Sequence, residues 1–297
     1  MNVKLRSLFS KLSLFGATLI WGGSFFVMKD TLNSIPPYYL LSLRFLVGAI
    51  TLSIIFIKKY KNFSIDYIAK GAILGIFLFI AYVFQTKGLI YTTPGKNAFL
   101  TVIYCIMVPF LYWLYSKVRP DIYNIIASII CVVGIGLVSV NEALTINIGD
   151  ILTMTGGLFF ALHIIAIAVF SKGKDIILLT IIQFASSGII SLIFALLFEE
   201  PPKYIESVSF ISLIYLCFFA TTVGLLLQNK GQKYVSPSSA AIILSLESVF
   251  GVLFSIIFYK EVLNLKTAIG FFLIFAAIII SETKLEFLRK QKENTGI

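Results

Sequence analysis

Long apolar runs restrict the fold of this chain more than any other feature of its sequence. An α-helix needs about 20 consecutive apolar residues to cross the hydrocarbon core of a bilayer. Runs close to that length recur along the chain. They cover residues 12–29, 38–57, 69–89, 96–116, 121–140, 150–170, 176–198, 208–228, 238–259 and 266–282. We therefore predict an all-α membrane protein with ten transmembrane helices.

The amino-acid composition also indicates a membrane protein. Hydrophobic residues make up 59% of the 297 residues and charged residues only 13%, whereas a soluble domain has about 25% charged residues. Such a chain cannot cover its surface with polar side chains, so we expect the lipid bilayer to surround it. The net charge of +10 resides in short segments between the apolar runs. That distribution suits lipid headgroups and argues against nucleic acid as a partner.

The distribution of Lys and Arg predicts the orientation of the chain. If the runs cross the membrane alternately, 17 Lys and Arg residues fall on the side of the termini and 6 on the other side. The positive-inside rule then places both termini, as tails at 1–11 and 283–297, in the cytoplasm. The N-terminus resembles a signal peptide, but no small-residue cleavage motif follows, so we expect the first run to be retained. The predicted localisation is the cell (inner or plasma) membrane.

Proline residues mark several expected helix boundaries. Thr93 before Pro94 and Ser236 before Pro237 predict N-caps that are followed by proline at the first helical position. Pro109 is the exception, because it lies inside the fourth run. There we expect it to kink the helix.

A small-residue pattern predicts close helix contacts. Gly71 and Gly75 form a GxxxG motif in the third run. Small residues recur in most of the runs, so we expect this motif to pack two helices of one chain rather than to join two chains. The sequence leaves open whether the protein is a monomer or a homodimer.

The second half of the chain repeats the design of the first. At a constant offset of 143 residues, the stretch 85–118 meets seven identical residues in the stretch 228–261. A weaker match at offset 139 extends this likeness toward the start of each half. Each half holds five runs, an odd number, so the second half must cross the membrane in the opposite sense. We predict two five-helix inverted-topology repeats, at 12–140 and 149–282.

Short motifs in a fixed order connect the chain to a known family. They are Trp21-Gly22-Gly23-Ser24-Phe25, Lys29, Arg44-Phe45, Gly95-Lys96-Asn97-Ala98-Phe99-Leu100-Thr101, Gly149-Asp150, Ala161-Leu162-His163-Ile164 and Leu246-Glu247. In the order and spacing of these motifs, the chain resembles EamA-type members of the drug/metabolite transporter superfamily, which have two five-helix EamA repeats. The family often has proline directly after the last glutamate, where this chain has Ser248. The resemblance implies a secondary carrier, often an exporter of amino acids, metabolites or drugs.

Two charged residues inside apolar runs are the first candidates for a site. Glu247 lies about ten residues into the ninth run, near the bilayer midplane, where a charge costs about 2.5–3.5 kcal/mol and therefore faces protein or water. It either couples transport to protons or binds a cationic group, or it is a structural carboxylate that is hydrogen-bonded or paired with Arg44. Arg44 lies about seven residues into the second run. It either binds a substrate carboxylate or snorkels to the interface as an anchor.

Uncharged polar and aromatic residues extend the candidate set. His163 is the only histidine, and it either relays protons or packs as a buried polar residue. Gln85 and Gln228 occupy matching repeat positions, where they either line two gates or hydrogen-bond between helices. Aromatic residues within the runs either form a pocket for a solute or belong to the core. The set is completed by Trp21, Ser24, Tyr82 and Tyr104.

We expect a secondary transporter that works by alternating access, with its solute site between the two repeats. In its most concrete form it exports amino acids or small metabolites or drugs, and Glu247 couples the export to protons. Two alternatives are an intramembrane enzyme and a non-transporting sensor. An enzyme needs clustered acids, a metal or an activated nucleophile, and the runs contain no such pattern. The short tails leave no room for the output domain of a sensor.

No cofactor or metal is predicted. The sequence contains no Walker motif and no phosphate-cradling loop. Three widely spaced cysteines and a single histidine do not form a metal-ligand pattern. The expected partners are therefore a small solute and the bilayer, with protons as the coupling ion in the version above.

Overall fold

The described part of the chain is helical. In this computed structural model it comprises residues 3–117, 119–139, 147–204 and 207–283, and within these ranges no β-strand occurs. Eight helices there are long and apolar enough to cross a membrane. They are Leu5–Thr31, Pro37–Ile55, Ile65–Tyr91, Pro94–Ser116, Ile148–Phe170, Ile176–Phe198, Val208–Gln232 and Pro237–Phe258. Two shorter apolar helices fall on the fifth and tenth predicted runs, at Ile122–Val138 and Leu265–Ile280.

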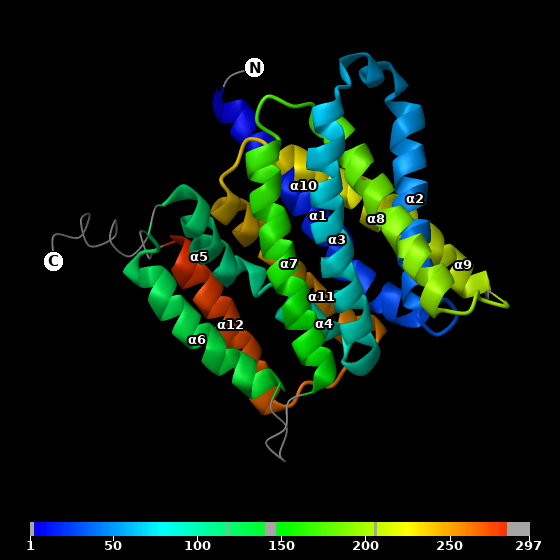
Figure 1. Cartoon of the computed structure of the whole chain (residues 1–297). Coiled ribbons are helices and arrows are strands. Elements are labelled where there is room, and N and C mark those ends of the chain that lie inside the picture. The colour runs from blue at the N-terminus through cyan, green and yellow to red at the C-terminus, as the bar shows by residue number, and fades with distance from the viewer. Residues whose placement is uncertain (1–2, 118, 140–146, 205–206, 284–297) are drawn as a thin grey trace.

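The first half of the chain forms six α-helices and a 3-10 turn (Figure 1). They are α1 (Val3–Thr31), α2 (Pro37–Ile55), η1 (Ile57–Asn62), α3 (Ile65–Tyr91), α4 (Pro94–Thr101), α5 (Tyr104–Ser116) and α6 (Ile122–Ser139). The first helix is longer than the apolar run at 12–29. It begins at Val3, so residues that we predicted as part of an N-terminal tail continue the helix.

The second half forms the remaining elements. They are α7 (Ile148–Phe170), α8 (Ile176–Phe198), α9 (Ser207–Ile214), η2 (Tyr215–Val223), α10 (Gly224–Gln232), α11 (Pro237–Phe258) and α12 (Leu265–Thr283). Here η2 is a stretch of π-helix that joins α9 to α10 in one span. Such stretches are uncommon, and they occur frequently at functional sites.

The two predicted N-caps are confirmed. The Thr93 hydroxyl accepts a hydrogen bond from the backbone N–H of Lys96 at 3.3 Å, at the start of α4. The Ser236 hydroxyl accepts one from the backbone N–H of Ser239 at 3.2 Å, at the start of α11. Each cap satisfies a backbone donor that the first turn of a helix leaves without a partner.

The fourth span is interrupted, but not at its proline. Helix α4 ends at Thr101 and α5 begins at Tyr104, so the break falls at residues 102–103. Pro109 lies inside α5, five residues beyond the start of that helix. The kink that we predicted at Pro109 stays a prediction, and the break at residues 102–103 is a separate feature of the span. The break brings Tyr104 to the first position of a helix that starts inside the protein.

Small residues allow the helices to approach closely. A Cβ atom on Gly71 would lie 2.6 Å from Ile182, and one on Gly75 would lie 2.6 Å from Ser186, so both glycines contact α8 directly. The GxxxG motif therefore packs two helices of the same chain, as we expected. Gly134 of α6 and Gly270 of α12 meet in the same manner, each within 2.9 Å of the other's carbonyl oxygen if a Cβ is added.

The main helix pairs connect the two halves of the chain. Helix α1 packs against α10 and α11, α2 against α8, and α3 against α7 and α8. Helix α6 packs against α12, and this pair lies side by side at the lower left of Figure 1. Most of the extensive helix contacts thus join an element before residue 140 to one after residue 147.

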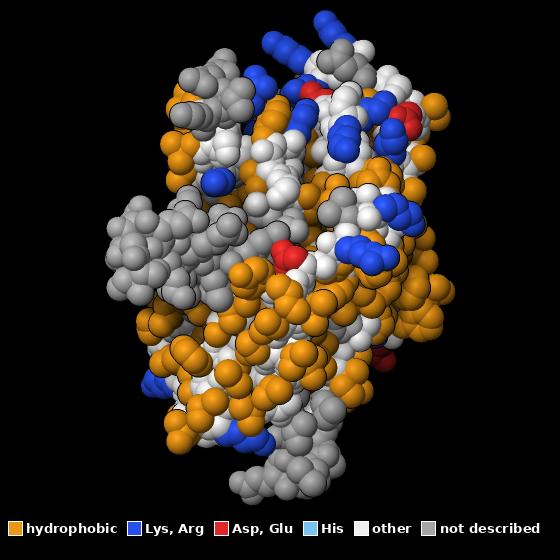
Figure 2. Space-filling model, turned by 90° about the vertical axis from the view of Figure 1, so that its left-hand side faces the viewer, with side chains coloured by type: hydrophobic (Ala, Val, Ile, Leu, Met, Phe, Trp, Pro, Cys, Tyr) orange, Lys and Arg blue, Asp and Glu red, His pale blue; other side chains and the backbone are white. Residues whose placement is uncertain are grey.

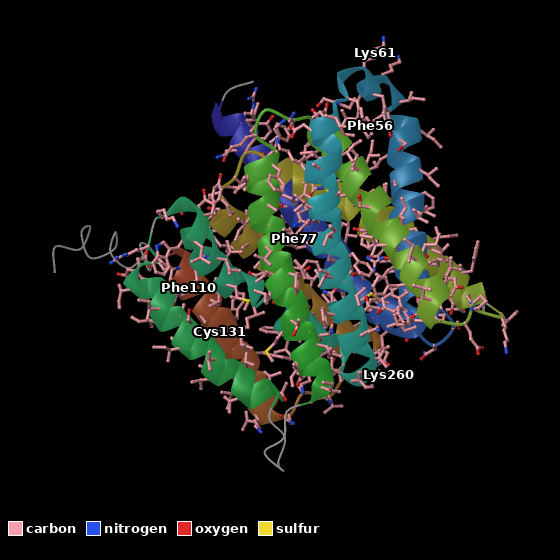
Figure 3. All side chains as sticks on the ribbon, viewed as in Figure 1. Phe56, Lys61, Phe77, Phe110, Cys131 and Lys260 are labelled. Atoms are coloured by element: carbon pink, nitrogen blue, oxygen red, sulfur yellow. The ribbon has the colours of Figure 1, made fainter. Side chains whose placement is uncertain are left out.

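The two ends of the bundle differ in charge. Lys61, in η1, and Lys260, between α11 and α12, lie at opposite ends (Figure 3). We call these the η1 end and the Lys260 end. Figure 2 shows Lys and Arg side chains gathered at the upper, η1 end, above a band of hydrophobic side chains. An apolar band between polar ends is the surface that a bilayer requires.

Candidate functional site

Eight of the nine candidate residues surround one internal cavity. The cavity lies among helices α1, α2, α3, α5, α7, α10 and α11, and its volume open to the centre of a water-sized sphere is about 30 Å³. The candidates that line it are Trp21, Ser24, Arg44, Tyr82, Gln85, Tyr104, Gln228 and Glu247. Their roles in binding or coupling stay predictions, but the helices bring them to one place.

Glu247 is the acidic pole of the cavity. It lies in α11 with 5% of its surface exposed, among the buried residues of that helix. One of its carboxylate oxygens, Oε1, accepts a hydrogen bond from the Tyr104 hydroxyl at 3.0 Å. Tyr104 is itself only 3% exposed. Tyr104 is the first residue after the helix break at residues 102–103, so the break places its side chain against the buried carboxylate.

Arg44 is the basic pole. Its side chain is 1% exposed, so it is buried in the protein and does not snorkel to the interface. Its Nε donates a hydrogen bond to the Thr221 hydroxyl at 2.9 Å, and Nη1 lies 3.3 Å from the sulfur of Met28. The guanidinium carbon lies 4.9 Å from the ring centre of Tyr82, a cation–π contact. The anchor interpretation of Arg44 is therefore wrong.

The two poles are not paired with each other. Within the described residues, the four salt bridges involve neither Arg44 nor Glu247. The pairing of Glu247 with Arg44 is therefore wrong, whereas the interpretation of Glu247 as a structural, hydrogen-bonded carboxylate stays an alternative, because it accepts from Tyr104. A buried charge without a counter-charge is costly. One cavity thus presents a guanidinium and a carboxyl group, neither of which forms a salt bridge within the described residues.

The π-helix η2 supports the basic pole. Thr221, which binds Arg44, lies within it, and the indole N–H of Trp21 donates to the carbonyl oxygen of Ala220 at 2.7 Å. Inside η2, the Thr222 hydroxyl donates to the Cys217 carbonyl at 2.7 Å, five residues earlier. The widened helix frees a carbonyl for Trp21 and turns a hydroxyl toward Arg44. Sequence reasoning missed Thr221, because an apolar run carries no signal for a π-helix.

The two glutamines face the cavity from matching positions. Gln85 in α3 and Gln228 in α10 are 5% and 4% exposed. Gln85 also donates from Nε2 to the Thr101 hydroxyl at 3.1 Å, which connects α3 to α4. Gln85 therefore both lines the cavity and forms a hydrogen bond between helices.

His163 is the candidate that the structure separates from the others. It is fully buried and does not line the cavity, although Phe160 and Ile164 of the same helix do. Its Nε2 lies 3.2 Å from Oε1 of Gln183 in α8. The rotation of α7 therefore directs His163 to α8, and only its helical neighbours face the cavity.

Several lining residues were missing from the sequence-based set. Phe25 and Met28 lie four and seven residues after Trp21, on the same face of α1. That spacing could have identified them once Trp21 was chosen. Leu244 lies three residues before Glu247 on the same face of α11, so the same spacing could have identified it. Phe160 and Ile164 carried no such signal, because they resemble the other apolar residues of their helix.

The Lys260 end is closed by bonds between the two halves. The buried carboxylate of Asp150 accepts from the Thr92 hydroxyl at 2.8 Å and pairs with Lys96 at 3.2 Å. Glu261 accepts from the backbone N–H of Gly95 at 3.0 Å and from the hydroxyl of Thr93. Acids of the second half therefore hold the connection between α3 and α4.

Ion pairs also join the halves at the η1 end. Lys174 pairs with Asp66 at 2.7 Å, and this hydrogen bond raises the pKa of Lys174. Lys59 pairs with Asp175. Burial would raise the pKa of Asp175, but the hydrogen bonds from Lys59 and the Ile177 N–H outweigh it and lower that pKa.

No metal site is evident in these ranges. Where the structure describes the chain, no three His, Cys, Asp or Glu side chains come together to hold an ion. The three cysteines are buried and form no disulfide. The chemistry that the cavity offers is therefore recognition by charge, hydrogen bonds and aromatic surface.

Comparison with known proteins connects this architecture to transporters. The profile of the EamA-like transporter family matches residues 8–140 and again residues 147–283. An uncharacterized transporter of Archaeoglobus fulgidus is 34% identical over 276 residues, which cover 93% of this chain and 86% of that protein. The uncharacterized transporter YyaM of Bacillus subtilis is 24% identical over 82% of this chain and 83% of its own length.

A solved structure has the same fold. A protein crystal structure superposes with a TM-score of 0.71, covering 93% of this chain and 98% of the other. The sequence identity is 13%, so this likeness concerns the fold alone.

Proposed function

The chain belongs to the EamA-like transporter family, and we propose that it is a secondary transporter that binds its solute between Arg44 and Glu247. The observation that carries this proposal is the buried guanidinium and the buried carboxyl group, which face one cavity without being paired. The chain is a multi-pass membrane protein, so a site enclosed among its helices suits a solute that must be shielded from lipid.

The proposed architecture is ten transmembrane helices in two inverted repeats, at 12–140 and 149–282. Tyr104 and Glu247, which are hydrogen-bonded, are 143 residues apart, the offset that relates the two halves. Residues that a two-fold axis exchanges can contact each other only next to that axis. Gln85 and Gln228, another pair at this offset, line the same cavity. These contacts support a solute site on the axis between the repeats.

The helix packing supports the same symmetry. Exchanging the halves relates α1 to α7, α3 to the span of α9 to α10, and the span of α4 and α5 to α11. The packing of α3 on α7 then corresponds to that of α10 on α1, and the packing of α1 on α11 to that of α7 on α5. The pairs α2 with α8 and α6 with α12 each correspond to themselves. Two bundles related in this way can rock against each other around a fixed site.

The solute class follows from the lining. Arg44 offers a rigid fork of donors for a carboxylate, and Glu247 accepts from an ammonium group. Aromatic rings of Trp21, Tyr82 and Tyr104 lie between or beside these poles. An amino acid, or a small metabolite or drug with similar charges and an apolar body, satisfies all three features.

The orientation and location of the protein rest on charge. The η1 end carries most Lys and Arg side chains on the face in Figure 2, so the positive-inside rule makes it the cytoplasmic end. Both termini then lie in the cytoplasm and the protein lies in the cell membrane. We assign export as the direction, as the resemblance to drug/metabolite transporters implies.

Protons are the proposed coupling ion, with Glu247 as their carrier. A carboxylate that binds either a proton or a cationic solute group, but not both, exchanges one for the other. Its position beside the axis allows access from each side in turn. Tyr104 donates a hydrogen bond to this carboxyl group and so fixes its position beside the axis.

The test uses purified protein in liposomes. An untargeted solute screen with and without a pH gradient first identifies the transported compound. We expect Glu247→Gln to abolish flux driven by the pH gradient while leaving insertion and folding intact. Glu200→Gln, which removes an exposed carboxylate beyond α8, is the matched control and keeps wild-type flux. Undiminished gradient-driven flux in Glu247→Gln would refute proton coupling through this residue.

A further inference from the structure

A second pocket lies at the η1 end and shares no residue with the central cavity. Its empty volume is about 740 Å³, and it lies between α1, η1, the start of α8 and the end of α10. Four of the side chains that line it are cationic. They are Arg6, Lys59, Lys230 and Lys233. The only acid among its lining residues is Asp175.

That acid does not neutralise the pocket. Asp175 is already bonded through Oδ2 to Lys59 and through Oδ1 to the backbone N–H of Ile177, at 2.9 Å for the latter. The remaining three cations have no carboxylate partner in the described ranges. Lys233 donates to the carbonyl oxygen of Lys174 at 2.9 Å, which holds its ammonium group in place. Its charge also acts on Asp175 and helps to lower the pKa of that acid, but the two form no salt bridge.

Aromatic contacts position the other two cations. The guanidinium carbon of Arg6 lies 5.4 Å from the ring centre of Tyr234, and the ammonium of Lys230 lies 5.8 Å from that of Phe56. These contacts come from separate elements, so the charges converge on the pocket from several sides. Three like charges around one space repel each other, and a bound anion would relieve that repulsion.

The adjoining surface of α1 is apolar. Its residues Leu5, Leu8, Phe9 and Leu12 are 46%, 53%, 53% and 54% exposed. They follow the spacing i, i+3, i+4 and i+7, which places them on one face of the helix. Phe9 also lines the pocket, so the apolar face adjoins the cationic space. We call these four residues the α1 stripe.

We propose that this pocket binds the phosphate headgroup of an anionic phospholipid, whose acyl chains lie along the α1 stripe. A free phosphate ion would satisfy the cations but leave the α1 stripe without a role. The lipid would connect Arg6 of α1 to Lys230 and Lys233 at the end of α10, two helices that pack against each other. It therefore links the two halves of the chain at the end where Lys59 and Asp175 already join them.

The test compares lipids that differ only in headgroup charge. The full-length protein is placed in nanodiscs of phosphatidylcholine alone or with about one quarter phosphatidylglycerol, a proportion that gives the leaflet a negative surface potential. The readouts are the thermal unfolding midpoint and the lipid that native mass spectrometry finds bound. We expect phosphatidylglycerol to raise the midpoint and to remain bound to the wild type.

Two charge-matched variants locate the effect. Arg6→Gln/Lys230→Gln/Lys233→Gln removes the three uncompensated cations from the pocket. Lys58→Gln/Lys61→Gln/Lys172→Gln removes three exposed cations that do not line it. Because each cation near an anionic surface adds about tenfold or less, we expect roughly 100-fold weaker retention of phosphatidylglycerol in the first variant and unchanged retention in the second. Equal losses in both variants would overturn the proposal, since they would indicate a diffuse attraction.

A third comparison separates lipid from free phosphate. Inorganic phosphate is added to protein in neutral detergent, and a Leu8→Ser/Leu12→Ser variant tests the α1 stripe. We expect phosphate to bind far more weakly than the lipid, and the stripe variant to lose lipid retention alone. Phosphate that stabilises the protein as well as the lipid does would refute a lipid site. If the triple variant fails to fold, the single variants Arg6→Gln and Lys230→Gln give the same comparison. Lipid retention is measured without transport, so this outcome is independent of the proposed function.

Discussion

Arg44 allows the most direct test of the proposed site, because its contacts leave part of the guanidinium for a solute. A guanidinium has five N–H donors, and the hydrogen bonds within the described residues engage Nε and Nη1. Arg44→Gln removes the charge and keeps a polar side chain of medium length. Loss of one partner from a buried, hydrogen-bonded charge pair costs about 2–5 kcal/mol. At about 1.4 kcal/mol per tenfold change, this corresponds to about 30-fold to 4,000-fold in affinity.

The assay compares an amino acid with its carboxamide. The twenty standard amino acids are first tested as competitors of transport by the wild type in liposomes, and the strongest is chosen. In the wild type we expect the acid to compete more strongly than its amide, because only the acid offers a carboxylate to Arg44. In Arg44→Gln we expect the two compounds to compete equally weakly.

The ratio of the affinity for the amino acid to the affinity for its carboxamide shows whether Arg44 binds the carboxylate. Lys87→Gln removes a cation that contacts Tyr38 near the Lys260 end, outside the cavity, and should keep the wild-type ratio. If Arg44→Gln also keeps the ratio, Arg44 does not bind a carboxylate. The inference from an uncompensated buried charge to a solute contact would then be refuted.

Three further changes test the packing and polar contacts around the cavity. Gly75→Ala should destabilise the protein by about 1–3 kcal/mol, because its Cβ would lie 2.7 Å from a backbone carbonyl of α8. In the control variant Gly136→Ala the added Cβ has no atom within 4 Å, so the stability should not fall. Thermal unfolding of both variants in detergent measures the difference. Thr221→Val should weaken solute binding about tenfold or more by releasing Arg44, and unchanged affinity in a competition assay would exclude this support. Gln232→Met should be neutral or stabilising, since both polar atoms of this buried side chain have no partner among the described residues; a clear drop in the unfolding midpoint would instead reveal a bound water.

The polar candidates illustrate how far sequence reasoning reached. Arg44 and Glu247 could be selected because a charge inside an apolar run is costly wherever it lies. His163 was selected by its chemistry, and the structure places it against Gln183 instead of in the cavity. The free-energy cost of a buried charge identifies a candidate residue, but it does not predict which neighbouring helix or cavity the side chain faces.

The sequence by itself determined the helical spans, their capped starts and the duplication of the chain. Each of these depends on residues close together along the chain, such as Thr93 with Pro94, or on a constant offset between two stretches. Only the tertiary structure decided the break before Tyr104, the π-helix around Thr221 and the contact between Tyr104 and Glu247. The physical reason lies in the helices themselves. They are apolar on nearly all faces, so no amphipathic pattern sets their rotation, which packing against neighbouring helices must choose.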